Sequence, residues 1–406
     1  MVSKLSLEGL RVIDLSWVQA GPFATKMLAD MGAEVIKIET YHKVDGFRVS
    51  GPWKDKTPTP PNRSGDFDSK NANKLSMLLN LRVAAGVEIF KRLLKVSDVV
   101  IENFTAGTMD RFGLEYSVLR DVNPKIIVVS MAGFGQTGPY SNYVSFGPTL
   151  QSISGLSSIT GFPGHDPLGL GIAYPDSIGG LFADLAILAG LRHRQSGKGQ
   201  YIDLSQYEAA VSVLGHTVLE YTVNNRVPQP VGNRHPYASP YGCYRCKGDD
   251  RWCVIAVYTE EEWKAFCNVI GNPDWTKSSK FATLLGRKRS EGELDRLVEG
   301  WTIGHSAEEV MELMQGAGVA AGIVQNIEDL ITRDPHMKAR GFYQEIEHPP
   351  LGKVILEGIP FKLSLTPGSL RTPAPLLGQH TDYVLKRILG MPQEEIDRFA
   401  AEGAFE

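Results

Sequence analysis

Residues 10–39 begin with Leu10-Arg11-Val12-Ile13-Asp14-Leu15-Ser16 and end with Glu34-Val35-Ile36-Lys37-Ile38-Glu39. Both runs have the length and the apolar, β-branched content of buried strands. Between them, Phe23–Met31 has a helical pattern that Gly32 ends. A strand, a helix and a strand within about 30 residues form a βαβ unit, which predicts parallel strands joined by a right-handed crossover.

The same alternation continues after this unit. We expect an amphipathic helix at Val83–Lys95 and further strands at Asp98–Glu102, Lys125–Ser130 and Tyr201–Leu204, the last followed by a helix from Gln206 to about Tyr221. This pattern predicts an α/β fold, in which helices cover both faces of a parallel sheet. Ligands of such sheets bind beyond the carboxyl ends of the strands. The first predicted site therefore lies where three loops converge: Trp17–Pro22, Asn103–Met109 and Ala132–Pro139.

Other segments indicate the organisation of the chain. Tyr41–Asn73 is rich in Pro, Gly, Asp and Lys and is predicted to be a long loop. Asn224–Ser239 marks a boundary, after which Pro240–Asn326 has strands and helices of its own. A second, smaller α+β lobe of roughly 90 residues is expected there. Beyond it we expect a β-hairpin over Pro349–Ser364 and a final helix over Asp382–Leu389.

The composition excludes several classes of protein. The chain has 406 residues and a formal net charge of −4, without a run of lysines or arginines. Neither a nucleic-acid partner nor an anionic membrane is therefore expected. Its four cysteines lie between residues 243 and 267, unlike a secreted disulfide framework. The chain start lacks a signal-peptide pattern, and no apolar run reaches about 18 residues. We expect a soluble cytoplasmic protein.

Familiar cofactor motifs are missing. The turn Gln19-Ala20-Gly21-Pro22 is neither a Gly-x-Gly-x-x-Gly nor a P-loop sequence, so a nicotinamide dehydrogenase or P-loop NTPase is not expected. Cys243-x-x-Cys246 lacks a second matched pair and favours strand residues over a metal site. The nine histidines form no catalytic or metal pattern. His235, in a turn between residues 232 and 237, is the candidate for contact with substrate.

One acid stands at the start of an apolar, small-residue-rich run. Asp176 follows Pro175, and Gly179 and Gly180 follow within one turn. An acid in this position is commonly only a helix cap, whose carboxylate the helix dipole keeps ionised. A carboxylate with glycines beside it also suits a nucleophile, and the first N–H groups of the helix would suit an oxyanion. Both interpretations are open from these residues alone.

Taken in order, the motifs of nearly the whole chain resemble the family III CoA-transferases, the group that includes formyl-CoA transferase and carnitine CoA-transferase. No single motif is specific, but the ordered set is. The matching residues are Asp14–Pro22, Leu28–Glu39, Asn73-Lys74, Leu79-Asn80-Leu81, Asp98–Phe104, Gly107, Asp110-Arg111, Gly113, Asn123-Pro124, Gly133-Phe134-Gly135, Gly138-Pro139, Ser154-Gly155-Leu156, Thr160-Gly161, Asp176, Gly180, Ala183 and Ala374–His380.

The resemblance implies a Rossmann-like domain built from both chain ends, a smaller domain between them and an interlocked dimer. The boundaries are expected at residues 1–224 for the large CoA-binding domain, 225–330 for the small domain and 331–406 for the return to the large one. The dimer is either a homodimer or, with a paralogous subunit, part of a heterodimer or heterotetramer. No tightly bound cofactor or metal is expected, because coenzyme A and its thioesters are substrates.

The resemblance also assigns site residues. Asp176 matches the family's nucleophile. Positions that contact CoA in the family are matched by Val18, Gln19, Ala20, Leu79, Asn103, Phe104 and Arg111, and Arg82 matches a lysine near the CoA phosphates. Two positions depart from the pattern: Thr40 stands where some members carry an arginine, and Val144 where formyl-CoA transferase has a lysine. Residues 232–239 replace a glycine-rich lid.

The expected reaction moves CoA from an acyl-CoA to a carboxylic acid through aspartyl anhydride and aspartyl-CoA thioester intermediates. Succinyl-CoA is the expected donor, and an aromatic-substituted dicarboxylate such as benzylsuccinate the expected acceptor. Phe146 is expected to contact the substrate, with Tyr140, Tyr143 and Tyr174 near the thioester. The alternatives are an epimerase of the α-methylacyl-CoA racemase kind, disfavoured because Ser145-Phe146-Gly147 replaces its Gly-His-Asp triplet, and a scaffolding subunit, disfavoured because Asp176 is retained.

Overall fold

The computed structural model describes residues 5–53 and 61–406 of the chain. The chain divides into two compact units. Unit 1 comprises Met1–Ser157, Gly169–Val227 and Met337–Glu406, and unit 2 comprises Ser158–Leu168 and Pro228–His336. Unit 1 therefore contains both ends of the chain, and residues 158–168 join unit 2 although they precede it in the sequence. The domain boundaries expected from the sequence stay a prediction.

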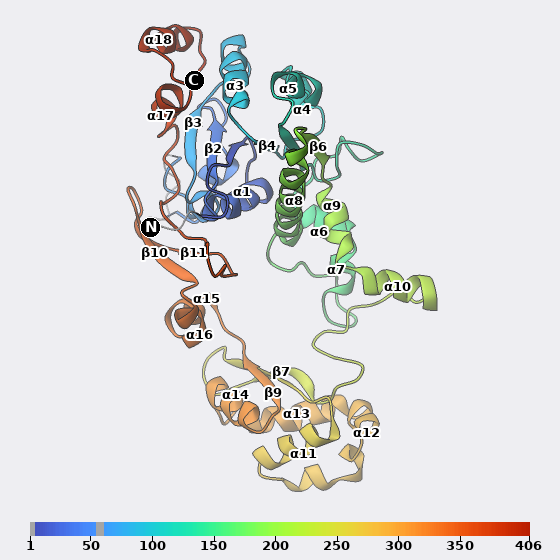
Figure 1. The fold of residues 1–406 in the computed structure, drawn as a ribbon. Helices are drawn as coiled ribbons and strands as arrows, with labels where there is room; N and C mark the ends of the chain where they lie inside the picture. Colours follow the sequence, from blue (N-terminus) through green and yellow to red (C-terminus); the bar gives the residue numbers. More distant parts are fainter. Residues whose placement is uncertain (1–4, 54–60) are drawn as a thin grey trace. The chain divides into compact units, whose positions relative to one another are not determined.

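A six-stranded sheet forms the centre of unit 1, and its order is β3-β2-β1-β4-β5-β6 (Figure 1). All five pairings between neighbouring strands are parallel. The order reverses direction between β1 and β4, which is where open α/β sheets bind their ligands. The predicted α/β, Rossmann-like fold is therefore confirmed. The strands are β1 (Arg11–Asp14), β2 (Glu34–Glu39), β3 (Leu75–Leu78), β4 (Val99–Glu102), β5 (Ile127–Ser130) and β6 (Gln200–Asp203).

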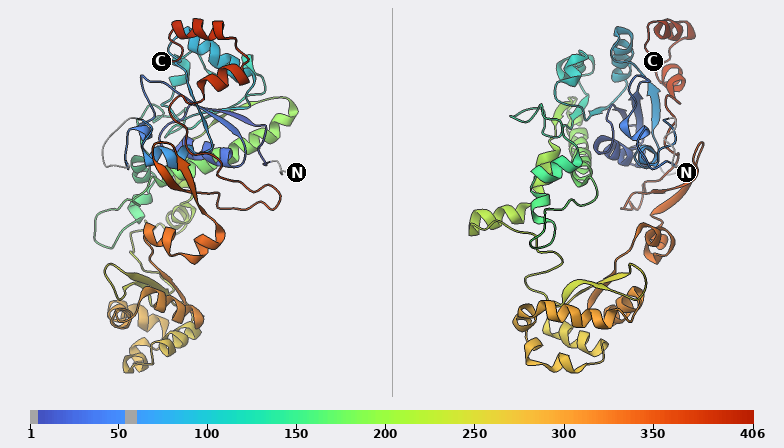
Figure 2. Two further views of the ribbon diagram at one scale, coloured as in Figure 1. Left: turned by 90° about the vertical axis from the view of Figure 1, so that its left-hand side faces the viewer. Right: turned by 180° about the vertical axis from the view of Figure 1, so that it is seen from behind.

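Alternate residues of β1 point to opposite faces of the sheet, and helices bury both. Val12 belongs to the core formed with α1 (Ala20–Asp30) and α8 (Tyr174–His193). Ile13, the next residue, belongs to the core that includes Phe90 of α3 and Phe399 of α18. The C-terminal helix α18 (Gln393–Ala401) lies beside α3 (Ala84–Lys95), as Figures 1 and 2 both show. Burial on both faces explains why these strands are short and continuously apolar.

Several segments differ from the sequence-based expectation. The predicted loop at residues 41–73 contains α2 (Gly65–Asn71), and the helix expected from residue 206 to 221 is two helices, α9 (Gln206–Ser212) and α10 (Gly215–Asn224). The hairpin is β10 (Tyr343–His348) with β11 (Gly352–Glu357), earlier than predicted. The remaining helices of unit 1 are α4 (Thr108–Arg111), α5 (Tyr116–Val122), α6 (Gly147–Ile153) and α17 (Thr381–Tyr383), which continues as a π-helical turn at Val384–Ile388. Two more helices, α7 (Leu156–Ile159) and α16 (Pro335–Arg340), span the boundaries between the units in the sequence.

Unit 2 contains a three-stranded antiparallel sheet in the order β7-β8-β9. Helices α11, α13 and α14 pack on it (Figure 2), and their core includes Trp263 and Phe266. The buried guanidinium of Arg287 donates to the carbonyl of Ser239 and to the carboxylate of Glu260. The elements are β7 (Tyr241–Arg245), β8 (Trp252–Ala256), β9 (Ala320–Ile323), α11 (Glu260–Val269), α12 (Leu284–Arg289), α13 (Glu291–Thr302), α14 (Ala307–Gly316) and α15 (Ile327–Thr332).

In the described part of the chain, no helix combines the length and the apolar character that crossing a membrane requires. The expected cytoplasmic location stays a prediction.

Candidate active site

The turn between β1 and α1 depends on a close approach of two backbones. A Cβ atom on Gly21 would fall 2.2 Å from the Cβ of Ser16, so a larger residue would push the helix away from the strand. Ser16 is itself fixed, because its N–H donates to Asp14 at 2.9 Å and its carbonyl accepts from Lys37 at 2.6 Å. Gly21 therefore allows the first turn of α1 to start directly above the carboxyl end of β1.

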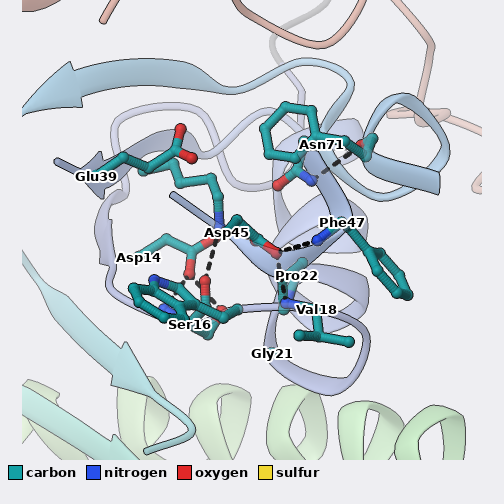
Figure 3. A network of polar contacts seen from close by, with 12 residues as sticks. Asp14, Ser16, Val18, Gly21, Pro22, Glu39, Asp45, Phe47 and Asn71 are labelled. Atoms are coloured by element: carbon teal, nitrogen blue, oxygen red, sulfur yellow. Dashed lines mark hydrogen bonds and ion pairs between the residues drawn. The ribbon is translucent and has the colours of Figure 1, made fainter. Parts of the chain in front are cut away.

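Buried ion pairs support this turn from behind (Figure 3). Lys37 pairs with Asp45 at 2.9 Å and Lys74 with Asp14 at 3.1 Å, and all four side chains are fully buried. Although burial raises the pKa of Asp14, the ammonium groups of Lys74 and Lys37 and two hydroxyl groups bring it down to about 2. A buried pair that loses one partner is strongly destabilised. The pairs therefore hold the loops after β1 and β2 in one arrangement.

Further along this loop, the backbone of Val18 is strained. Val18 has φ = +65°, a left-handed conformation that is costly for a β-branched residue. Its N–H donates to Oδ1 of Asp45 at 2.9 Å, and Phe47 donates to the same oxygen (Figure 3). Asn103, at the end of β4, accepts from the N–H of Trp17 and donates to its carbonyl, both at 2.8 Å. Side chains from two loops, Asp45 after β2 and Asn103 after β4, thus fix residues 17 and 18 across the reversal point of the sheet.

A cavity of 670 Å³ opens at this edge of unit 1. Residues from all three loops that the sequence analysis predicted to converge line it. The predicted site residues in its wall are Val18, Leu79, Arg82, Asn103, Phe104, Arg111, Phe146 and Asp176. The volume is within the range of about 300–1,000 Å³ that is typical of ligand sites.

Three predicted residues are not in this wall. Gln19 directly precedes α1, and Ala20 is fully buried, with its carbonyl 3.0 Å from the place of a Cβ on Gly180. His235 belongs to unit 2, where its ring packs against Tyr241 at 5.2 Å and Tyr258 at 5.5 Å. Of the expected tyrosines, Tyr143 lines the cavity. Tyr140 and Tyr174 are outside the lining, and the Tyr140 ring packs against the Tyr143 ring with their centres 5.0 Å apart.

The order of the strands places the positively charged residues of the cavity wall at one end of the cavity. Lys43, Arg82 and Arg111 follow β2, β3 and β4, whereas Ala132 and Gln206 follow β5 and β6. Parallel strands lie about 4.8 Å apart, so the cavity runs across the sheet from a cationic end to an uncharged one. Asp176 belongs to the uncharged end, because its Oδ2 lies against Gly147 of α6, the helix that follows β5. A molecule with phosphates at one end and a reacting carbonyl at the other fits this arrangement.

Asp176 is the third residue of α8, at the start of a helix as expected, but the N–H groups of this helix start mostly donate to backbone carbonyls. The N–H of Tyr174 donates to Ile172, and those of Asp176 and Ser177 donate to the carbonyl of Ala173. Pro175 has no N–H. These N–H groups already have acceptors within the chain, and the oxyanion site expected in this first turn stays a prediction.

The electrostatics of Asp176 also differ from the expectation. Oδ2 is buried and has no hydrogen-bond partner in the part of the chain that the structure describes. Burial raises the pKa of Asp176 to about 6, against a smaller opposing effect of its own backbone N–H. The expectation that the helix end favours the ionised form is outweighed by burial. The carboxylate is less stabilised than one in water and correspondingly more nucleophilic.

Sequence reasoning missed other lining residues. Trp17 stacks edge-on against Phe104 at 5.7 Å, and Lys43 lies over the Trp17 ring at 5.0 Å. Gln206 donates from Nε2 to the carbonyl of Met131. The position of Trp17 and Lys43 directly after strands could have indicated them, but no local signal places Gln206 near Asp176.

The cysteines do not form a metal site. Within residues 5–53 and 61–406, no group of three or more His, Cys, Asp or Glu side chains could hold a metal ion. Cys246 and Cys253 are buried in unit 2, and burial raises the pKa of each thiol. Such buried thiols, Cys253 within β8 and Cys246 directly after β7, are unreactive.

Comparison with known proteins agrees with this geometry. The family model described as CoA-transferase family III matches residues 7–381. The chain belongs to CoA-transferase family III.

Relatives resemble this family III CoA-transferase over nearly its whole length. It is 33% identical to a succinyl-CoA–D-citramalate CoA-transferase of Chloroflexus aurantiacus over 98% of this chain and 97% of that protein. It is 34% identical to the beta subunit of a succinyl-CoA–L-malate CoA-transferase of the same organism, over 97% and 96%. A crystal structure of a CAIB/BAIF family protein from Brucella suis has a TM-score of 0.87 at 31% identity and covers 95% of this chain and 100% of that one.

Membership in the family confirms the predicted activity at the coarse level. The protein is an enzyme that transfers CoA between an acyl-CoA and a carboxylic acid. CoA thioesters are its substrates.

Proposed function

We propose that Asp176 is the nucleophile of this transfer and that CoA occupies the 670 Å³ cavity with its phosphates at the cationic end. The observation that supports this proposal is a half-buried carboxylate at the uncharged end of the same cavity, one of whose oxygens has no hydrogen-bond partner among the described residues. The roles of Val18, Leu79, Arg82, Asn103, Phe104 and Arg111 in holding CoA are part of the proposal.

The proposed reaction has four steps. The Asp176 carboxylate attacks the thioester carbonyl of the donor, and CoA leaves as a thiolate while a mixed anhydride forms. The thiolate attacks the aspartyl carbonyl, releasing the donor acid and forming an aspartyl-CoA thioester. The acceptor carboxylate attacks that thioester and releases the thiolate again. Finally the thiolate attacks the acyl carbon of the new anhydride, which restores the Asp176 carboxylate.

The proposed donor is succinyl-CoA, and the proposed acceptor is a dicarboxylic acid. Both relatives described above are named for succinyl-CoA and a dicarboxylate. Near Asp176 the lining combines the aromatic rings of Tyr143 and Phe146 with the hydroxyl groups of Ser141 and Ser145. An acceptor with an aromatic substituent, such as benzylsuccinate, matches such a wall. A role for His235 at the substrate stays part of the proposal.

The lining argues against an epimerase. Moving an α-proton requires an acid–base pair next to the α-carbon. The residues around Asp176 in the cavity wall are uncharged, and Phe146 cannot take up a proton. We therefore keep epimerisation as the second candidate only because it shares the CoA site. Incubating wild-type protein with an α-branched acyl-CoA in deuterated water, without an acceptor acid, separates the two: deuterium uptake supports epimerisation.

The decisive experiment traps the intermediate on Asp176. Wild-type protein is incubated with succinyl-CoA and then with hydroxylamine, and the peptide carrying Asp176 is analysed by mass spectrometry. We expect an aspartyl hydroxamate at this residue and its absence from Asp176→Asn, whose CoA transfer should fall by at least about 10⁴-fold. Near-normal transfer by Asp176→Asn or Asp176→Ala contradicts the proposed nucleophile.

We also propose that the enzyme is a dimer, either of two copies or with a paralogous subunit, as the beta-subunit name of one relative suggests. Leu181, Leu185 and Leu188 form an exposed stripe at helical spacing on α8, and Leu219 and Val223 form another on α10. Exposed apolar stripes of this kind mark interaction surfaces. Light scattering of the purified chain alone distinguishes a homodimer from a chain that needs a paralogue. A monomer with full activity contradicts both the homodimer and the assembly with a paralogue.

A further inference from the structure

Lys43 is a cation in the cavity wall that the sequence analysis did not assign. Its side chain is exposed, and its ammonium has no carboxylate partner among residues 5–53 and 61–406. The fully buried lysines nearby, Lys37 and Lys74, each have one. Lys43 is therefore available to a ligand, whereas the buried lysines serve the fold.

The backbone and an aromatic ring hold Lys43 in place. The chain turns sharply after β2, because the N–H of His42 donates to the hydroxyl of Thr40 at 2.9 Å. An antiparallel bridge pairs Thr40 with Lys43, so the two side chains leave the same side of the turn. The Lys43 ammonium then lies 5.0 Å from the centre of the Trp17 ring. Asn103 holds the backbone of Trp17 through two hydrogen bonds. This cation–π contact orders a side chain that is otherwise mobile.

The charges around Lys43 favour an anion. Arg82 and Arg111 line the same end of the cavity, and the acids in its wall are Glu39 and Asp176. Glu39 is fully neutralised, since both of its oxygens accept from Arg48 at 2.7 Å. Asp176 lies toward β5 and β6. The cationic end therefore has positive charge in excess, the condition for binding a phosphate.

We propose that Lys43 binds a phosphate group of the CoA moiety, an assignment that rests on the proposed CoA site. Thr40 carries no charge, and its hydroxyl oxygen accepts from the N–H of His42 in the turn. Its bridge partner Lys43 supplies the cation at the same place. An arginine at position 40 would leave the turn on the same side, so it should replace the lysine.

The test is calorimetric binding of CoA and of 3′-dephospho-CoA to the full chain. We expect Lys43→Gln to weaken CoA binding about tenfold and to reduce its salt dependence, while Lys43→Arg stays near wild type. The double variant Thr40→Arg/Lys43→Gln should regain most of the loss. Lys95→Gln, an exposed lysine outside the cavity wall on α3, is the matched control and should bind as wild type does.

The two ligands identify the phosphate. If Lys43 binds the 3′-phosphate, Lys43→Gln and wild type bind dephospho-CoA equally. If it binds the diphosphate, the loss persists with dephospho-CoA. Unchanged CoA affinity in Lys43→Gln, with an unchanged melting temperature, overturns the inference. A wild-type protein that does not bind CoA refutes the proposed site instead, so the two failures are distinguishable.

Discussion

The Oδ2 atom of Asp176 lies so close to Gly147 that a Cβ on Gly147 would fall 2.1 Å from it. Gly147 is the buried first residue of α6 and has no positive φ, so the glycine is required for room rather than for backbone conformation. Because Oδ2 is covered, the other carboxylate oxygen, Oδ1, is left to face the cavity. If Asp176 is the nucleophile, as proposed, this contact leaves Oδ1 as the attacking oxygen.

Replacing this glycine should displace the nucleophile. In Gly147→Ala the new methyl group and Oδ2 cannot both keep their places, and we expect kcat for CoA transfer to fall about 100-fold, the usual effect of a displacement of about 1 Å. CoA affinity should stay within about twofold, since the cationic end is unchanged. Gly300, a helical glycine with open space around it, provides the control: Gly300→Ala should keep both the kcat and the CoA affinity of wild type. A Gly147→Ala variant with wild-type kcat would show that Asp176 is not held in this way.

The pH dependence of the reaction should report Asp176. Burial raises its pKa to about 6, and only the deprotonated carboxylate attacks. Activity, measured as kcat/KM for succinyl-CoA, should therefore be low at pH 5, rise through pH 6 and level off above pH 7. A profile that stays flat down to pH 5 would indicate a pKa near the ordinary value of 3.8, and hence a solvated carboxylate.

A second carboxylate on the same helix should affect stability rather than catalysis. Both oxygens of Asp184 are buried without a hydrogen-bond partner in the described chain, and burial raises its pKa well above the ordinary value, although Lys74 opposes this. Folding therefore favours the protonated form, so stability falls as pH rises above the ordinary Asp range. Asp184→Asn cannot ionise and escapes this loss.

Urea unfolding between pH 5 and pH 8 tests the Asp184 prediction. The free energy of unfolding of wild type should decrease with pH more steeply than that of Asp184→Asn, by up to about 1.4 kcal/mol per pH unit. Parallel curves would mean that the Asp184 carboxylate has a partner in solution, such as a second subunit.

In the first βαβ unit, both ends of β2 were predicted correctly, because the pattern that marks this strand is local. The residues of Glu34–Glu39 alternate between two buried faces, and Gly32 ends the preceding helix. β3 was missed, since Leu75–Leu78 is only four residues long and lies close behind the segment 41–73 that was predicted to be a loop. The Ser76 hydroxyl donates to Glu39 across the sheet, a contact that no local pattern shows. The hairpin was placed too late because its two prolines form the turn after His348, rather than the start of a strand.

The candidate site shows the same difference between local patterns, which the sequence reveals, and contacts between distant segments, which it does not. Loops after parallel strands were predicted to converge, and they do, because sheet topology brings them to one edge. What the sequence could not show is which segments pack on Asp176. α6 places Gly147 against Oδ2 from 29 positions earlier in the chain. The capping preference of an acid at a helix start gave the wrong direction for its pKa, because local propensity ignores burial by distant elements.

The Asn103–Trp17 pair gives the sharpest test of the CoA end. Asn103 satisfies both the N–H and the carbonyl of Trp17. In Asn103→Asp the N–H keeps an acceptor, but the carbonyl loses its donor and faces a carboxylate. An unsatisfied carbonyl in a partly buried position costs about 1–3 kcal/mol, so CoA binding should weaken roughly five- to 150-fold through disorder of the Trp17–Val18 loop, with kcat changed less than KM.

Asn123→Asp separates this effect from general instability. Asn123 also donates from its amide to two backbone carbonyls, those of Leu94 and Ser97 at 2.9 Å, but it precedes β5 and lies outside the cavity wall. This variant should lower the melting temperature while the folded protein keeps wild-type CoA affinity. If both variants lose stability and neither loses affinity, the Asn103–Trp17 pair supports only the fold, and Val18 owes its strained conformation to Asp45 alone.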